Sequence, residues 1–198
     1  MEDLFNTVLS YRRQLEMKLD PMRYEHSLSV SYTSMNLAMR YGSDLRKAEL
    51  AGLLHDCGKR FTDEMILRKC EKHHISITIE ERQAPAVLHA NYGAWLAEHK
   101  YGVTDPDILS AILYHTTGRA EMSLLEKIIY IADYIEPRRY IAAVLPRIRS
   151  LAFEDLDETM YEILKGTLEY LEKKGGVIDP MTVEAWNYYQ KLHDVTSS

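Results

Sequence analysis

The sequence predicts an all-α protein, and two observations carry this prediction. Its 198 residues include only 9 glycines and 6 prolines, fewer than the average usage of about 12% for the two together would supply. Long stretches therefore lack residues that break helices. Apolar residues also recur at intervals of three and four along most of the chain, which is the spacing of one helix face. Both observations disfavour a turn-rich β fold.

The expected helices can be taken in order along the chain. The first carries an apolar stripe made of Leu4, Val8, Tyr11 and Leu15. Four later helix starts share a capping side chain followed by proline, or by glutamate three residues on: Asp20-Pro21, Thr78 with Glu81, Ser123 with Glu126, and Asp179-Pro180. Six breaks contain glycine or proline: Tyr41-Gly42, Gly58, Gly102, Gly118, Pro137 and Gly175-Gly176. These signals predict roughly eight helices with short connections.

Composition narrows the class of protein. With 46% hydrophobic residues, a chain of this length can bury one sizeable core, which predicts one domain and excludes disorder, collagen and coiled-coil rods. The net charge of −6 provides no global basic field, so we expect no nucleic-acid partner and no anionic membrane partner. No apolar run approaches the roughly 18 residues of a membrane-spanning helix.

The cysteines and the N-terminus suggest a compartment. Two cysteines, Cys57 and Cys70, cannot make a disulfide framework of the kind found in small secreted proteins. The first residues begin with acidic side chains and carry charges every few positions, unlike a secretory signal. We therefore expect a cytoplasmic protein.

Six polar side chains fall on otherwise apolar helix faces. His26 shares its face with Met22, Val30, Thr33 and Leu37. The same spacing places five more polar groups inward: His55, Asp56, His89, His115 and Asp133. The other four histidines are expected on the surface: His73, His74, His99 and His193.

Together these six residues predict a metal site. One histidine on an apolar face is usually a hydrogen-bonded core residue. A buried carboxylate, however, costs several kcal/mol unless it is paired, and the neutral imidazoles around Asp56 and Asp133 provide no charge. A bound cation satisfies both kinds of group. Four imidazoles and two carboxylates suit iron, manganese or zinc, and the lack of clustered cysteines argues against a thiolate site.

Basic and hydroxyl residues accompany the predicted ligands. They are Arg23 before His26, Lys59 after Asp56, Thr116 and Arg119 after His115, and Arg138 and Arg139 after Asp133. We expect Arg23, Lys59, Thr116, Arg138 and Arg139 to bind the phosphates of an anionic substrate, with Lys59 neutralising charge on the leaving phosphate. A solvated loop position is the alternative for Arg60, Arg119 and Arg139. Tyr134, Tyr140 and Trp186 are candidates for stacking on a purine, although core packing is the commoner role.

The order His26, His55-Asp56, His89, His115 and Asp133 resembles the HD-domain metal-dependent phosphohydrolases, and in particular their dinuclear branch. The neighbouring residues narrow the resemblance: Arg-Tyr-Glu-His at 23–26, Leu-Leu-His-Asp-Cys-Gly-Lys at 53–59, His-Thr-Thr-Gly at 115–118 and Ile-Ala-Asp-Tyr-Ile-Glu-Pro-Arg at 131–138. This set is similar to the bacterial YqeK-type HD proteins, small di-iron enzymes that cleave diadenosine tetraphosphate symmetrically to two ADP.

The resemblance implies one compact HD-domain helical bundle over residues 1–198, with a metal-binding core at about 20–140 and C-terminal helices at 141–198 packing on it. It also implies that Asp56 bridges two divalent or mixed-valent metal ions, most often iron, with Mn, Zn and Mg as alternatives. His26, His55 and Asp133 would complete one site, and His89 and His115 the other. A metal-bridging hydroxide would then attack the phosphate, so that Asp56 and Lys59 are the expected catalytic residues.

Other functions stay open at this point. The same ligand set serves HD-type di-iron oxygenases, and other HD phosphohydrolases act on guanosine alarmones or cyclic dinucleotides. A nucleotide-binding sensor with a degenerate metal site would lack one or more ligands, and none is missing here. The expected partner is a dinucleoside polyphosphate or another purine nucleotide, and a homodimer is left open.

Overall fold

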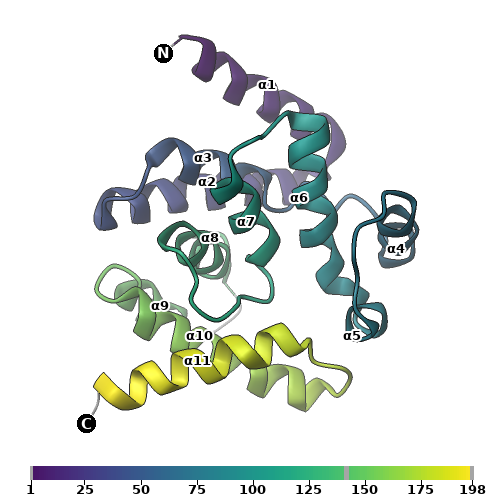
Figure 1. The fold of residues 1–198 in the computed structure, drawn as a ribbon. Coiled ribbons are helices and arrows are strands. Elements are labelled where there is room, and N and C mark those ends of the chain that lie inside the picture. Colours follow the sequence, from purple (N-terminus) through teal and green to yellow (C-terminus); the bar gives the residue numbers. More distant parts are fainter. Residues whose placement is uncertain (1, 141–142, 197–198) are drawn as a thin grey trace.

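The structure of the protein, a computed structural model, describes residues 2–140 and 143–196 (Figure 1). Within these residues the secondary structure consists of eleven α-helices and one short 3-10 helix, without a strand, which confirms the all-α prediction. The elements are α1 (Glu2–Lys18), α2 (Pro21–Tyr41), α3 (Leu45–Leu54), α4 (Asp63–Lys72), α5 (Ile79–Gln83), η1 (Pro85–Val87), α6 (Leu88–Tyr101), α7 (Pro106–Tyr114), α8 (Leu124–Ile135), α9 (Leu145–Leu151), α10 (Leu156–Lys174) and α11 (Pro180–Thr196).

The four predicted helix starts are confirmed. Asp20 and Asp179 each accept a hydrogen bond from a backbone N–H of the first turn. Thr78 and Ser123 each form a complete capping box with the glutamate three residues on. The count of roughly eight helices was too low, because α5 and α6, and likewise α9 and α10, are separate elements with no predicted break between them. Asp155, for example, caps α10 by accepting from the backbone N–H groups of Asp157 and Glu158, a start that the glycine and proline breaks did not mark.

Helices α2, α3, α7 and α8 pack on one another in the middle of the molecule, with α6 against α7 and the α10–α11 pair beneath α8 (Figure 1). Helices α2 and α3 approach each other closely at Gly52. A Cβ at this position would lie 2.9 Å from the Cα of Ser31 and 2.8 Å from the hydroxyl of Ser34. This contact holds the end of α3, which carries His55 and Asp56, beside α2.

Most of the predicted apolar positions are buried. Val8 and Leu15 of the first stripe are in the core, while the side chain of Leu4 lies outside the described residues. On the face of His26, Val30 and Leu37 are fully buried. Met22 was predicted on the same face but is 80% exposed, because no other helix covers the first turn of α2 there.

Two of the four histidines expected on the surface are half-buried against partners on other helices. His73 stacks on Trp95, with ring centroids 3.9 Å apart. His193 lies 2.7 Å from a carboxylate oxygen of Glu158. Both are half-buried, whereas His74 and His99 are exposed as expected. Helical spacing did not reveal these contacts because each one joins two different helices or a helix and a turn.

Both cysteines are buried and free. Burial raises the pKa of the Cys57 thiol to about 12 and that of Cys70 to about 11, so both are protonated at neutral pH. This agrees with the absence of a predicted disulfide or thiolate site. Separately, none of the helices in the described part of the chain is both long and apolar enough to cross a membrane.

Candidate metal centre

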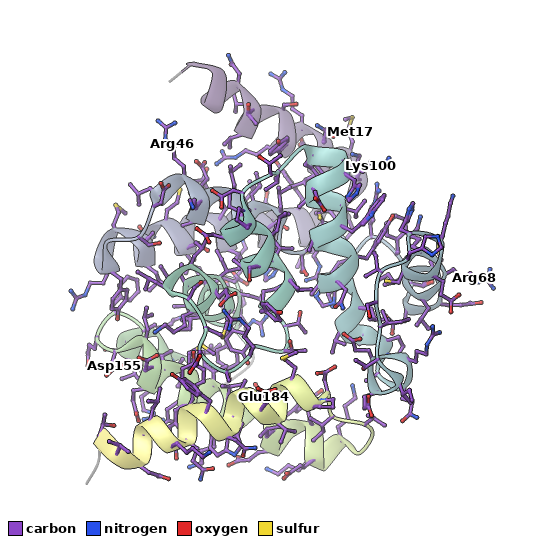
Figure 2. All side chains as sticks on the ribbon, viewed as in Figure 1. Met17, Arg46, Arg68, Lys100, Asp155 and Glu184 are labelled. Atoms are coloured by element: carbon purple, nitrogen blue, oxygen red, sulfur yellow. The ribbon has the colours of Figure 1, made fainter. Side chains whose placement is uncertain are left out.

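The six predicted ligand side chains come together between five helices, and their ligand atoms form three overlapping groups within which all atoms lie inside 4.8 Å of one another. They are His26 of α2, His55 and Asp56 directly after α3, His89 of α6, His115 directly after α7, and Asp133 of α8. Charged side chains such as Arg46, Arg68 and Lys100 point outward at the periphery instead (Figure 2). Residues from five separate stretches of sequence thus form one buried polar centre.

The turn after α3 lies directly against α6, and two glycines make this possible. A Cβ at Gly58 would lie 2.4 Å from the carbonyl oxygen of His89, and one at Gly93 would lie 3.4 Å from the carbonyl oxygen of His55. A side chain at Gly58 would therefore push the turn away from α6. With glycine there, Asp56 Oδ1 comes within 3.4 Å of His89 Nε2.

All four histidines at the centre present the same nitrogen to it. In His55, His89 and His115, Nδ1 lies 2.6–2.7 Å from the backbone carbonyl oxygen three residues earlier. In His26, Nδ1 lies 3.3 Å from the carboxylate of Glu136. Because these oxygens accept hydrogen bonds, each Nδ1 donates its proton away from the centre and each Nε2 is the ring nitrogen that faces it. The neutral rings therefore have a free lone pair on Nε2.

The free lone pairs point at one another. His26 Nε2 lies 3.3 Å from His55 Nε2 and 3.0 Å from Asp133 Oδ1. His89 Nε2 lies 3.1 Å from His115 Nε2. So many acceptors in a buried space are unfavourable unless a positive charge lies among them. The residues present therefore fit bound divalent metal ions, for which imidazole nitrogen and carboxylate oxygen are suitable ligands.

Asp56 divides its two oxygens between the two histidine pairs. Oδ2 lies 3.5 Å from His55 Nε2 and 3.8 Å from His26 Nε2. Oδ1 lies 3.4 Å from His89 Nε2 and 3.6 Å from His115 Nε2. A carboxylate can join two cations, whereas an imidazole has a single lone pair to offer. The two oxygens of Asp56 thus face different histidine pairs.

The protonation states also suit cation binding. Burial lowers the pKa of His55 to about 4 and that of His89 to about 3, so both rings are neutral at pH 7. Burial alone would raise the pKa of Asp56 and of Asp133, but the nearby histidines outweigh it and hold both carboxyls below their usual range. His55 and His89 are therefore neutral imidazoles beside two ionised carboxylates. At His26, burial alone would lower the pKa, but the carboxylates of Asp133, Asp56 and Glu136 outweigh it and raise that pKa.

Glu136 is a residue of the centre to which the sequence reasoning assigned no role. Its buried carboxylate accepts the proton of His26 Nδ1 and also the backbone N–H of Arg138, the latter at 2.7 Å. A carboxylate behind a ligand histidine fixes the orientation of the ring and raises its basicity. The signal in the sequence was an acidic residue at the end of α8, just before Pro137.

Three of the five predicted substrate-binding residues contact the ligand set directly. Arg23 donates to Asp56 Oδ2 at 2.6 Å, and Arg139 donates to Asp133 Oδ1 at 3.2 Å. The Thr116 hydroxyl lies 3.0 Å from the Nε2 of His89. These groups place hydrogen-bond donors around the centre.

The other basic residues have different surroundings. Lys59 is exposed in the turn after Asp56. Arg138 is 56% exposed, and its guanidinium is paired with Glu25 at 2.7 Å. Arg119, a further candidate, is bound at 2.8 Å to the buried Glu126. Arg119 therefore compensates a buried charge.

A cavity of about 550 Å³ opens beside the centre, between α8, α10 and the turn after α8. His115, Thr116, Asp133 and Arg139 line its inner end. Of the three aromatic residues considered for purine stacking, Tyr134 also lines this cavity. Tyr140 is 83% exposed, and Trp186 stacks instead on Tyr161.

Comparison with known proteins identifies a family whose sequence model covers all six predicted ligands. The sequence model of the HD domain matches residues 23–138. The symmetrical bis(5'-nucleosyl)-tetraphosphatase of Bacillus subtilis is 38% identical over 174 residues, which are 88% of this chain and 92% of that protein. Its counterpart in Staphylococcus aureus is 40% identical over 186 residues, 90% of this chain and 92% of that protein. A crystal structure from Clostridium acetobutylicum, described as a predicted HD superfamily hydrolase involved in NAD metabolism, superposes with a TM-score of 0.88 at 40% identity, covering 94% of this chain and 97% of that one.

Proposed function

This chain belongs to the HD-domain family, and from this premise and the names of its relatives we infer that it is a symmetrical bis(5'-nucleosyl)-tetraphosphatase. The substrate is diadenosine tetraphosphate, and the enzyme adds water across its central phosphoanhydride. The observation that carries this conclusion is the buried centre around Asp56, in a chain that matches such enzymes over most of its length.

The reaction breaks one bond and forms one. The oxygen of water bonds to one of the two inner phosphorus atoms, and the central bridging oxygen leaves with the other half of the substrate. Each half is then ADP. The chain needs no nucleophile of its own for this reaction, because water is the attacking group.

The centre divides into two proposed metal sites. His26, His55 and Asp133 would form one site with Asp56 Oδ2, and His89 and His115 would form the other with Asp56 Oδ1. When bound, the metal pair supplies a lowered pKa for the attacking water and a positive charge to offset the phosphate oxygens. Glu136 orients His26 for its part in the first site.

The residues around the centre would hold the substrate. Arg23 and Arg139, which now donate to ligand carboxylates, can turn their remaining N–H groups to phosphate oxygens. The Thr116 hydroxyl can donate in the same way. Lys59 and Arg138 are the proposed outer contacts, with Lys59 close enough for its charge to disfavour protonation of His89.

Lys59 provides a test of these substrate contacts. Lys59→Ala should lower kcat/KM by about tenfold or more and leave the metal content unchanged, since a charge-assisted hydrogen bond is worth roughly 1.5–3 kcal/mol. Arg60→Ala is the matched control, because Arg60 is adjacent but its guanidinium lies 4.5 Å over the ring of Phe61. Equal kinetics for wild type and Lys59→Ala would assign Lys59 to the solvated surface.

Product analysis tests the function itself. Diadenosine tetraphosphate, incubated with protein purified with its native metal, should yield ADP as the only nucleotide product and consume no oxygen. The products can be separated by ion-exchange chromatography while an oxygen electrode follows the same reaction. AMP with ATP would contradict the cleavage position, and oxygen-dependent turnover would contradict the reaction class.

Several finer points complete the proposal. We propose iron as the bound metal, because nitrogen and oxygen ligands without a thiolate suit it, with Mn, Zn and Mg as alternatives. We also propose a cytoplasmic enzyme, and one domain over residues 1–198 whose core spans about 20–140. Metal analysis of the purified protein tests whether the bound metal is iron.

A further inference from the structure

The cavity beside the metal centre has the size and position of a ligand site. Its volume of about 550 Å³ falls within the roughly 300–1,000 Å³ of small-molecule pockets. It is lined both by His115 and Asp133 of the centre and by Gly166 and Tyr170 of α10. A ligand could therefore reach the centre with one end while the rest of it lies along α10.

Two other cavities are less suited to a nucleotide. One, of about 250 Å³, is lined by Glu81, Asp179 and Glu184, whose carboxylates would repel phosphates. The other, of about 510 Å³, lies along α6 and α7 around Trp95 and includes Glu98. In contrast, the basic side chain of Arg139 lines the cavity at Gly166. The carboxylate that lines this cavity, Asp133, belongs to the proposed metal centre.

Gly166 keeps this cavity open. It lies in the interior of α10, a helix of 19 residues, although glycine is the poorest helix former after proline. A Cβ built on Gly166 meets nothing within 4 Å, so packing with another element does not require a glycine here. A larger side chain would instead extend into the cavity that Gly166 lines.

Three tyrosines line the same space: Tyr130, which is buried, and Tyr134 and Tyr170, which are not. Tyr170 follows Gly166 by one helical turn, on the same side of α10, and its side chain is 62% exposed. Tyr134 lies on the opposite wall, with the Arg139 guanidinium 5.6 Å from its ring centroid. Exposed aromatic rings beside a flat stretch of helix can stack on a nucleobase.

We propose that this cavity binds the nucleoside of one half of the dinucleoside substrate, with the base beside Gly166 and Tyr170 and the phosphates directed past Arg139 to the centre. This inference rests on the proposed function for the identity of the ligand. Because each product is a nucleoside diphosphate, the same cavity should hold ADP after cleavage.

Filling the cavity tests this proposal. Gly166→Leu should weaken ADP binding to the metal-loaded protein by roughly tenfold or more, measured by calorimetry, and should raise KM for diadenosine tetraphosphate similarly. Inhibition by inorganic pyrophosphate, which lacks a nucleoside, should change less than about twofold. Lys165→Leu, which adds the same side chain one residue earlier on another side of α10, is the matched control and should bind ADP like wild type.

Tyr170→Ala provides a second test of the nucleoside site, since an exposed side chain can be truncated without loss of the fold. It should weaken ADP binding and leave pyrophosphate inhibition unchanged. Equal ADP affinity in wild type, Gly166→Leu and Tyr170→Ala would overturn the proposal, as would an equal loss of ADP and pyrophosphate affinity in both variants. Selective loss of ADP binding in a protein that makes no ADP from the tetraphosphate would support the nucleoside site and contradict the proposed function instead.

Discussion

Replacing Asp56 with alanine should abolish metal binding and catalysis together. Each oxygen of this carboxylate faces one histidine pair, so Asp56→Ala removes a ligand and the shared negative charge from both proposed metal sites. We expect metal content to fall at both and kcat/KM to fall by at least about 100-fold, since even outer-shell changes at metal sites have effects of roughly 10–100-fold.

His115→Ala is the matched comparison for Asp56→Ala. It removes one neutral ligand from one half-site and leaves His26, His55, Asp56 and Asp133 in place, so this variant should retain about one metal per chain. Elemental analysis gives the metal content, and circular dichroism shows whether each variant stays helical. A folded Asp56→Ala protein that holds two metals and hydrolyses the substrate normally would defeat the proposed centre.

Thermal unfolding separates lost metal binding from lost folding. A ligand at 100 times its Kd stabilises the native state by about 2.7 kcal/mol, so added metal should raise the Tm of chelator-treated wild type. The Tm of Asp56→Ala should not respond to the same metal concentration. An equal rise in Tm for both proteins would show that Asp56 contributes no metal ligand.

A single methyl group at Gly58 should also disable the enzyme. The new Cβ would lie 2.4 Å from the carbonyl oxygen of His89, a backbone atom that no side-chain rotation can move. The turn after α3 must therefore shift away from α6 and take Asp56 with it. We expect Gly58→Ala to destabilise the fold by about 1–3 kcal/mol. A misplacement of about 1 Å can cost roughly 100-fold in rate.

Gly166→Ala is the control for this prediction, because it adds the same methyl group where nothing lies within 4 Å. It should stabilise α10 by up to about 1 kcal/mol and leave the metal content unchanged. Urea unfolding measures the free energy of both variants, and metal analysis reports on the centre. The kcat/KM of Gly58→Ala is compared with wild type alone, because Gly166 lines the proposed nucleoside cavity. A Gly58→Ala enzyme with wild-type metal content and activity would show that the contact between the turn and α6 does not position Asp56.

Local chemistry explains why much of the fold was predictable. The caps at Asp20, Thr78, Ser123 and Asp179 satisfy N–H groups within three residues, so the sequence contains both partners. A helix start without a glycine or proline break shortly before it was missed, as at Asp155. Met22 was misplaced because helical spacing identifies a face but does not say how far along the helix that face is covered.

The all-α fold and the set of polar residues that turn inward could be read from the chain alone, because residue type and helical period are local properties. Three features of the centre follow from tertiary packing instead: which oxygen of Asp56 faces which histidine pair, the contact of Glu136 with His26 from 110 residues away, and the pairing of Arg138 with Glu25. The same packing leaves a cavity at Gly166 beside the centre. These features depend on the distances between helices. The packing of the whole core sets those distances, and a local sequence pattern does not contain them.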